Sequence, residues 1–191
     1  SAGTGRITHW DGVLHACLNA AAFVCSGPAT GASMDLAALS DCATLAVRAL
    51  DNAALQASIA AQHLRIGMIG VADALALLGL RYDSDPGRMQ AAAMAKAIAE
   101  GCLQGSVMLA AERGTCGHEA HASVACARLR GLPEELLHAA ARHGVRHVQL
   151  TTVTSQPRLA LLANDVADAI DPLRGKNHAI VIGASDGQTI T

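Results

Sequence analysis

The sequence predicts a mainly α fold, a bundle of five to seven helices with one or two short strands. Three observations predict it. Apolar residues recur at three- and four-residue steps over long stretches, which is the spacing of one helix face. Hydrophobic residues make up 51% of the chain but aromatic residues only 2%, so Ala, Leu, Val and Ile must build the core, which favours closely packed helices. Glycine and proline stand where such helices would begin and end.

One long helix is expected near the start of the chain, from Met34 to about Gln62, with Ser33 as its N-cap. The apolar residues of this stretch recur at helical steps, which places them on one face. They are Leu36, Leu39, Ala43, Val47, Leu50 and Ala54.

Residues 67–78 are expected to bend and then to form a second helix. Two glycines three residues apart, Gly67 and Gly70, predict a turn. Val71–Leu78 follows as a helix that ends at Gly79, a residue type common just past helix C-termini. The stretch lacks the third glycine of a dinucleotide-binding loop, which excludes that motif here.

A third helix is expected to begin near Pro86 and to end at Gly114. The sequence DSD at residues 83–85 is interpreted as its capping region rather than as a paired-carboxylate site. Gly101 and Gly105 lie four residues apart on one face of this helix and cost about 1 kcal/mol each relative to alanine. A neighbouring backbone that approaches closely at these glycines is the expected compensation.

The last third of the chain is expected to combine helices with short strands. Leu132–Gly144 has Pro133 at its start, two acidic residues in its first turn and basic residues in its last, which predicts a helix. Val145–Val153 is rich in β-branched residues and predicts a strand. A helix over Arg158–Ile170 and another strand over His178–Ala184 complete the predicted elements.

Length and charge limit the class of protein. A chain of 191 residues is expected to form a single domain, residues 1–191, with poorly defined ends at 1–13 and 174–191. The net charge of −2 and the scattered positions of 14 Lys and Arg argue against nucleic-acid binding. The apolar runs are much shorter than the roughly 20 residues of a membrane span, so we expect no membrane association and a cytoplasmic location. Six cysteines without a CxxC pair are expected to be structural thiols.

One stretch, CGHEAH at residues 116–121, gathers metal-ligating residue types. Cys116, His118 and His121 are the candidate metal ligands, and the two histidines would share one face of a helix. A second ligand pair at a standard spacing is missing, although a histidine between residues 138 and 147 could supply a ligand through the fold. The alternative interpretation is an exposed loop followed by a helix start.

Residues 65–88, RIGMIGVADALALLGLRYDSDPGR, combine an arginine, spaced glycines and an Ala-Asp pair. This stretch resembles the segment Arg-x-Ile-Gly-Leu-Gly-Val-Met-Gly-Leu-Ala-Asp in the large, catalytic subunit of ribonucleotide reductases, the adenosylcobalamin-dependent class in particular. Further similar stretches occur in the family's order at Leu18–Val24, Leu45–Ala53, Ala110–Thr115 and Leu159–Leu173. The resemblance covers about residues 14–173 and implies the helical part of that subunit without its full barrel.

The positions that carry the family's chemistry differ in this chain. The family places a thiyl-radical cysteine and a carboxylate in an Asn-x-Cys-x-Glu loop just upstream of the segment that aligns with Leu14. Residues 1–13 contain neither cysteine nor glutamate. Cys17 stands where the family usually has a serine, near an aligned reducing cysteine, and it is the candidate redox residue. The resemblance thus implies a homologue that is degenerate at its catalytic motifs.

The family's Pro-Thr-Gly-Thr-Ile-Ser turn, which resembles a phosphate cradle, aligns with SQPRLA at residues 155–160. Pro157 lacks a backbone N–H donor, so the cradle cannot form as it does in the family. Ser155 and Arg158 remain the candidate phosphate-binding residues, because arginine can bind phosphate through two parallel hydrogen bonds. The alternative for Arg158 is a solvated arginine at a helix start.

Two functional hypotheses follow. In the first, a non-catalytic, reductase-like protein needs no cofactor and acts by self-association, most simply as a homodimer, or by binding a reductase subunit or small ligand. In the second, the chain is a component of an adenosylcobalamin-dependent reductase and contributes to ribonucleotide reduction with a partner chain. The residues themselves favour the first hypothesis, in which the chain is not an enzyme. In the second hypothesis it would be a reductase-related oxidoreductase.

Overall fold

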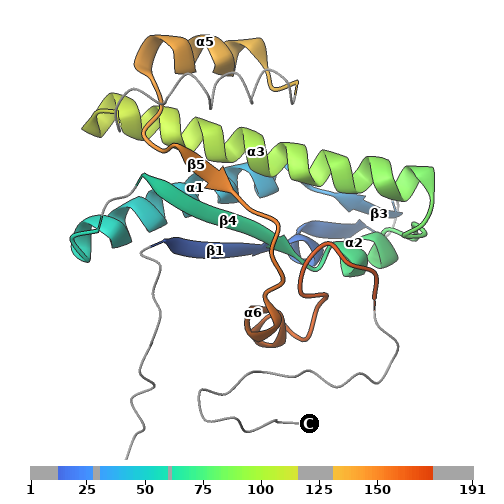
Figure 1. The fold of residues 1–191 in the computed structure, drawn as a ribbon. Coiled ribbons are helices and arrows are strands. Elements are labelled where there is room, and N and C mark those ends of the chain that lie inside the picture. Colours follow the sequence, from blue (N-terminus) through green and yellow to red (C-terminus); the bar gives the residue numbers. More distant parts are fainter. Residues whose placement is uncertain (1–12, 28–30, 60–61, 116–130, 174–191) are drawn as a thin grey trace, which may run out of the picture.

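The structure, a computed structural model, describes residues 13–27, 31–59, 62–115 and 131–173, and it shows an α/β fold (Figure 1). Strands β1 (Leu14–Asn19), β4 (His63–Ile69) and β5 (Gln149–Thr151) form a parallel sheet in the order β1-β4-β5. β2 (Val24–Gly27) and β3 (Gly31–Met34) form a separate antiparallel pair. The predicted mainly α bundle of five to seven helices with one or two short strands is therefore wrong.

The stretch with the two glycines, which was predicted to be a turn, is instead a strand followed by a turn. Gly67 lies inside β4, and only Gly70, whose φ is 69°, turns the chain toward the next helix. Leu64 and Ile66 alternate toward the helices and are almost fully buried, which is the period-two pattern of a strand. A strand that contains glycine resembles a turn in sequence, because the glycine contributes no side chain to the alternation.

The helices begin close to their predicted starts, although the first one ends at Gln56 rather than at about Gln62. They are α1 (Leu36–Gln56), α2 (Val71–Leu77), α3 (Asp85–Arg113), α5 (Glu134–His143) and α6 (Pro157–Leu162), with a 3-10 turn, η1, at Ala20–Phe23. Asp35, rather than the predicted Ser33, caps α1 by accepting from the N–H of Ala38 at 2.9 Å. The predicted capping role of residues 83–85 is confirmed, since Ser84 Oγ accepts from the N–H of Gly87 at 3.1 Å.

Two elements predicted for the C-terminal third are shorter in the structure than expected. The strand expected over Val145–Val153 is limited to β5, and the helix expected over Arg158–Ile170 ends at Leu162. Asn164 and Asp165 have φ values of 67° and 58°, a left-handed conformation that cannot continue a helix. The predicted strand His178–Ala184 lies outside the described residues.

α1 and α3 pack side by side and cover one face of the sheet (Figure 1). The predicted close approach at Gly101 is confirmed, because a Cβ atom there would overlap the carbonyl oxygen of Ser40 and lie 2.9 Å from the Cβ of Ala43. Thr44 Oγ1 donates to the carbonyl oxygen of Gly101 at 2.9 Å across the same contact. Gly105 meets Thr44 in a similar but looser way. The two glycines therefore let the helices lie against each other.

The apolar core lies between these two helices and the sheet. Its largest fully buried apolar side chains are Leu39, Val47, Leu64, Ile66, Val71, Leu75, Met94 and Leu109. A smaller cluster beneath α5 contains Leu103, Val107, Leu132, Leu137, Ala140 and Val145. None of the described helices combines the length and apolar composition that a bilayer crossing requires.

Candidate functional site

The sheet presents its second face away from α1 and α3. Leu14, Ala16 and Leu18 of β1 pack into the core, so the alternating residues His15, Cys17 and Asn19 point to the opposite side. The same alternation turns Arg65 and Gly67 of β4 to that side, and Arg65 Nη1 lies 3.2 Å from His15 Nε2. We call this surface the open face. It carries polar side chains where the helix-covered face carries apolar ones.

Cys17, the predicted redox residue, lies on the open face beside Gly67. A Cβ atom placed on Gly67 would be 3.5 Å from Cys17 Sγ and 3.6 Å from Cγ2 of Thr152, so β1, β4 and the residue after β5 meet here. Burial raises the pKa of the Cys17 thiol. Because the thiolate is the form that exchanges with disulfides, a raised pKa disfavours that reaction at neutral pH. The redox role stays a prediction.

The described cysteines are expected to be alkylated at rates that follow the exposure of their thiols. Cys25 is exposed, Cys17 is half-buried, and Cys102 is fully buried with a pKa raised to about 12 by burial. At pH 7.5, iodoacetamide should label Cys25 at least about tenfold faster than Cys17, and Cys102 only after urea is added. Peptide mass spectrometry of timed samples measures the rates. Labelling of Cys17 before Cys25 would show an activated thiol and support the redox role instead.

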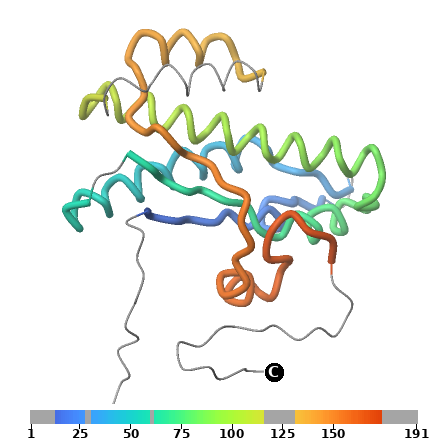
Figure 2. Tube along the Cα trace, viewed as in Figure 1, coloured from blue at the N-terminus to red at the C-terminus, as the bar shows by residue number. Residues whose placement is uncertain are grey.

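The three parallel strands end at the same edge of the sheet. Turns of the chain pack against this edge and cover it. Asn19 Oδ1 accepts from the N–H of Ala21 at 3.1 Å. The N–H of Gly70 donates to the carbonyl of Ala167 at 2.7 Å, and the N–H of Ala167 donates to Asp73 Oδ2 at 2.7 Å. Figure 2 shows the chain after β5 running past this edge to α6, on the side of the sheet away from α3. The edge is thus covered by residues 152–171.

Ser155, one predicted phosphate-binding residue, lies in this covering segment. Its hydroxyl donates to the carboxylate of Asp168, and the N–H of Gln156 donates to the carbonyl of Asp168 at 2.8 Å. Arg158 is exposed in the first turn of α6, and Pro157 begins that helix as expected. A phosphate at Ser155 would have to displace Asp168, whose negative charge repels it. Phosphate binding by Ser155 and Arg158 stays a prediction.

A buried polar cluster, which the sequence analysis did not identify, joins α1, α3 and the chain before β5. Asp51 of α1 is fully buried, and its carboxylate accepts from Arg113 and from Arg146 Nε, the latter at 2.6 Å. His147 Nε2 lies 3.3 Å from Asp51 Oδ1. Asp51 lies on the buried face of α1, where buried residues recur every four positions at Leu39, Ala43 and Val47. A charged residue at the next such position was the sequence signal that could have revealed this cluster.

Ser106 completes this cluster from α3. Its Oγ accepts from the N–H groups of Arg146 and His147, each at 3.1 Å, and lies 3.0 Å from His147 Nδ1. His147 lies between Ser106 and Asp51, as the histidine of a hydrolase triad lies between its serine and aspartate, but here Nδ1 faces the serine and Nε2 the carboxylate, the reverse of that triad. All three side chains are fully buried, however, and Ser106 already binds two backbone donors. The cluster therefore joins elements of the fold and does not meet a substrate.

Burial also sets the protonation states of this cluster. It lowers the pKa of His147 to about 4, although the charge and hydrogen bond of Asp51 oppose that shift. Desolvation opposes ionisation of Asp51, but hydrogen bonds from Arg146 and Arg113 hold its pKa below the usual value. In the folded protein at neutral pH, His147 is neutral and Asp51 is ionised.

The free energy of unfolding is expected to fall in mild acid because of His147. Between its unfolded pKa of about 6.5 and its folded pKa of about 4, the unfolded chain binds a proton that the folded chain does not, so stability decreases as pH falls. The loss between pH 7.5 and pH 5 is about 2 kcal/mol. Urea unfolding at several pH values measures it. The variant H147Q should lose this dependence, and an unchanged pH profile in H147Q would contradict the assignment.

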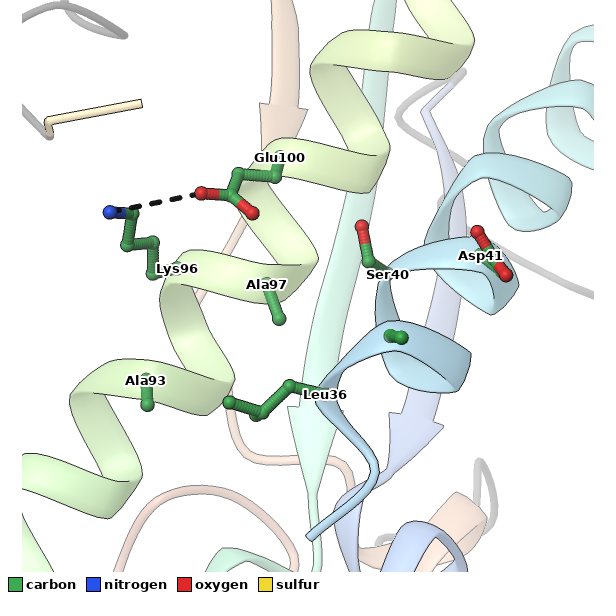
Figure 3. Close-up of a pocket in the computed structure, with 8 residues that line it drawn as sticks. Leu36, Ser40, Asp41, Ala93, Lys96, Ala97 and Glu100 are labelled. Atoms are coloured by element: carbon green, nitrogen blue, oxygen red, sulfur yellow. Dashed lines mark ion pairs between the residues drawn. The ribbon is translucent and has the colours of Figure 1, made fainter. Parts of the chain in front are cut away.

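A groove between α1 and α3 has a volume of about 500 Å³ (Figure 3). Its floor is formed by small side chains such as Ala93 and Ala97. Figure 3 shows Lys96 and Glu100 turned toward each other along α3, with Nζ 3.8 Å from Oε1, while Asp41 points away from α3. The charged groups do not converge on one point, so the groove offers no catalytic arrangement.

The predicted metal ligands Cys116, His118 and His121 lie outside the described residues, so the metal prediction stays open. Among the residues that the structure describes, no group of three or more His, Cys, Asp or Glu side chains is arranged to hold a metal ion. His147, whose two ring nitrogens face Ser106 and Asp51, is occupied in the buried cluster.

The chain was compared with families of known proteins. A family model described as "Ribonucleotide reductase, barrel domain" matches residues 15–177. A search of curated proteins found no match. The family model matches nearly the same residues as the resemblance in sequence, which covers about residues 14–173. Its description, however, names a barrel domain. The expectation of a helical part without its full barrel is therefore corrected: β1, β4 and β5 are parallel strands with helices on one face, as in a barrel wall.

Proposed function

The chain belongs to the ribonucleotide reductase barrel-domain family, and from this premise we propose that it acts by association rather than by reducing ribonucleotides itself. Its partner is a second copy or a reductase subunit. No cofactor is needed for this role, and the proposal places the chain in the cytoplasm.

The observation that carries the proposal is the incomplete sheet. β1 pairs with β4 on one side, and no described strand pairs with its other side. Parallel sheets are normally covered on both faces, and a closed barrel leaves no strand edge unpaired. The three strands therefore amount to one arc of a barrel wall, with polar residues on the face that would line its interior. An arc of this kind favours association with further protein.

Two further features support a role without catalysis. The thiol of Cys17 has a raised pKa, which disfavours thiol exchange, and the hydroxyl of Ser155 donates to a carboxylate. Residues 152–171 cover the edge where the parallel strands end, the edge at which α/β proteins commonly bind their ligands.

The proposal is tested by assaying association and turnover on one preparation. Sedimentation velocity over a range of concentrations should show self-association, with a dimer as the first species. Incubation with ribonucleoside di- or triphosphates and dithiothreitol, with and without adenosylcobalamin, should yield no deoxyribonucleotide. Turnover by the purified chain alone would overturn the proposal, and so would a monomer at all concentrations that also fails to bind a reductase subunit.

A second candidate function rests on the position of Cys17. A thiol on the open face would point into a barrel that a partner chain completes, so the chain would contribute to adenosylcobalamin-dependent ribonucleotide reduction within a complex. In that case a mixture with the partner chain is active, and the variant C17S abolishes this activity without preventing association. Calorimetric titration with a ribonucleotide would show heat for the complex, and the variant R158A would reduce it if Arg158 binds phosphate.

A further inference from the structure

We propose that α6 of one copy of this chain docks into a groove between α3 and α5 of a second copy. The inference rests on the proposed self-association and assigns the two surfaces that make the contact.

The groove lies on the helix side of the molecule and has a volume of about 570 Å³. Val107 and Met108 of α3 and Leu136 and Ala139 of α5 give it an apolar lining. Met108 is 43% exposed, so the lining reaches the surface. The volume falls within the range of about 300–1,000 Å³ typical of pockets that enclose a drug-sized group. One face of a short helix is of that size.

α6 carries the apolar side chains that such a groove requires. Leu162 is 82% exposed, and Leu161 and Leu159 are 39% and 36% exposed. Ala160 is the buried residue of α6, so this helix is anchored by a small side chain and presents its leucines outward. Six residues make only about 9 Å of helix, which the groove can accommodate.

The charges at the two surfaces are complementary. Glu135 lines the groove, as does Glu100, which is paired with Lys96 at 3.8 Å, and Arg158 is exposed in the first turn of α6. A positive side chain that flanks the leucines would meet the carboxylate of Glu135 as the helix docks. Charges placed this way at the rim of an interface fix orientation and speed association.

The position of the two surfaces determines the kind of contact. Figure 1 shows α5 and α6 on opposite sides of the sheet, so α6 cannot reach the groove of its own chain. Two surfaces that differ and face opposite ways join copies head to tail. A dimer formed in this way keeps one groove and one α6 unoccupied, and longer species follow at higher concentration.

Single substitutions at either surface test the contact. L162D in α6 and M108D in the groove should each weaken self-association about ten- to a hundredfold, as expected for losing one buried apolar side chain. L45D, at a leucine of α1 that is 66% exposed, is the matched control and should associate like the wild type. Sedimentation velocity measures the constants, and circular dichroism checks that each variant is folded.

Mixing the two variants gives the sharper test. L162D retains an intact groove and M108D an intact α6, so an equimolar mixture should form a 1:1 dimer that does not grow further. A symmetric contact through one shared surface would not be restored by mixing. The charge variants E135R and R158E should each weaken association, and the double variant E135R/R158E should recover it.

The outcomes separate this inference from the proposal on which it rests. If the wild type associates while L162D and M108D associate equally well, the assigned surfaces are wrong and self-association stands. If the wild type is monomeric at every concentration, both self-association and these surfaces are overturned. A mixture of L162D and M108D that stays monomeric overturns the head-to-tail contact alone.

Discussion

Replacing Gly101 by alanine is expected to lower the free energy of unfolding by about 3 kcal/mol, even though alanine is the better helix former. The new Cβ atom would overlap the carbonyl oxygen of Ser40 and lie 2.8 Å from its carbonyl carbon. These are backbone atoms of α1, so a side-chain rotation cannot relieve the overlap and the two helices must separate. Thr44 would then lose its hydrogen bond to the carbonyl of residue 101. Urea unfolding measures the difference.

Two neighbouring substitutions on α3 serve as controls for Gly101. G105A is expected to cost less, because its Cβ would be 2.9 Å from the carbonyl oxygen of Thr44 and 3.1 Å from the Cβ of Val47. Q104A, at an exposed position, should change stability by no more than about 0.5 kcal/mol. If G101A proved as stable as Q104A, α1 and α3 would not pack as closely as described.

Replacing Asp51 by alanine is expected to cost about 3–5 kcal/mol, the range for removing one partner of a buried ion pair. Arg113 and Arg146 both donate to this carboxylate, and Arg146 has only 12% of its side chain exposed. Without Asp51 two guanidinium groups keep their charge in a poorly solvated place. The same urea experiment measures the loss.

The matched control for Asp51 is an exposed ion pair on the same two helices. Arg48 of α1 donates to Glu112 of α3 through two hydrogen bonds, and about a third of the Arg48 side chain is exposed. E112A should therefore cost much less stability than D51A, because solvent screens exposed ion pairs. If D51A and E112A lowered the free energy of unfolding equally, the buried ion pairs of Asp51 would contribute no more to stability than an exposed pair does.

Helices could be predicted from this sequence because their signals are local. Ser84 and Pro86 start α3 and Gly114 follows its end, and each of these residues acts within one helical turn. Of the three strands of the parallel sheet, only β5 lies within a predicted strand; β1 was not predicted, and the glycines in and after β4 were interpreted as a turn. A parallel strand is fixed by partners far along the chain, and no local pattern records them.

The candidate site was predictable only in part, for a similar reason. Cys17 and Ser155 were chosen from a resemblance, and the structure places them on the open face and in the segment that covers the strand ends. The contact of Ser155 with Asp168 could not be predicted, since it depends on how the turn at Asn164 folds back. The buried cluster was missed because the partners of Asp51, which include Arg146 and His147, lie about 95 residues further along the chain, so no local pattern joins them.

The register of the sheet also sets the order in which this protein can fold during its synthesis. Leu14 pairs with Leu64, and His63 pairs with Gln149, which lies 86 residues further along the chain. At about 5–20 residues per second, the ribosome needs roughly 4 to 17 s to make the chain between those two partners. Throughout that interval the central strand of the sheet has an unpaired edge. A nascent chain of this kind is exposed to intermolecular strand pairing, and chaperones that shield β4 before β5 emerges would raise the yield of folded protein.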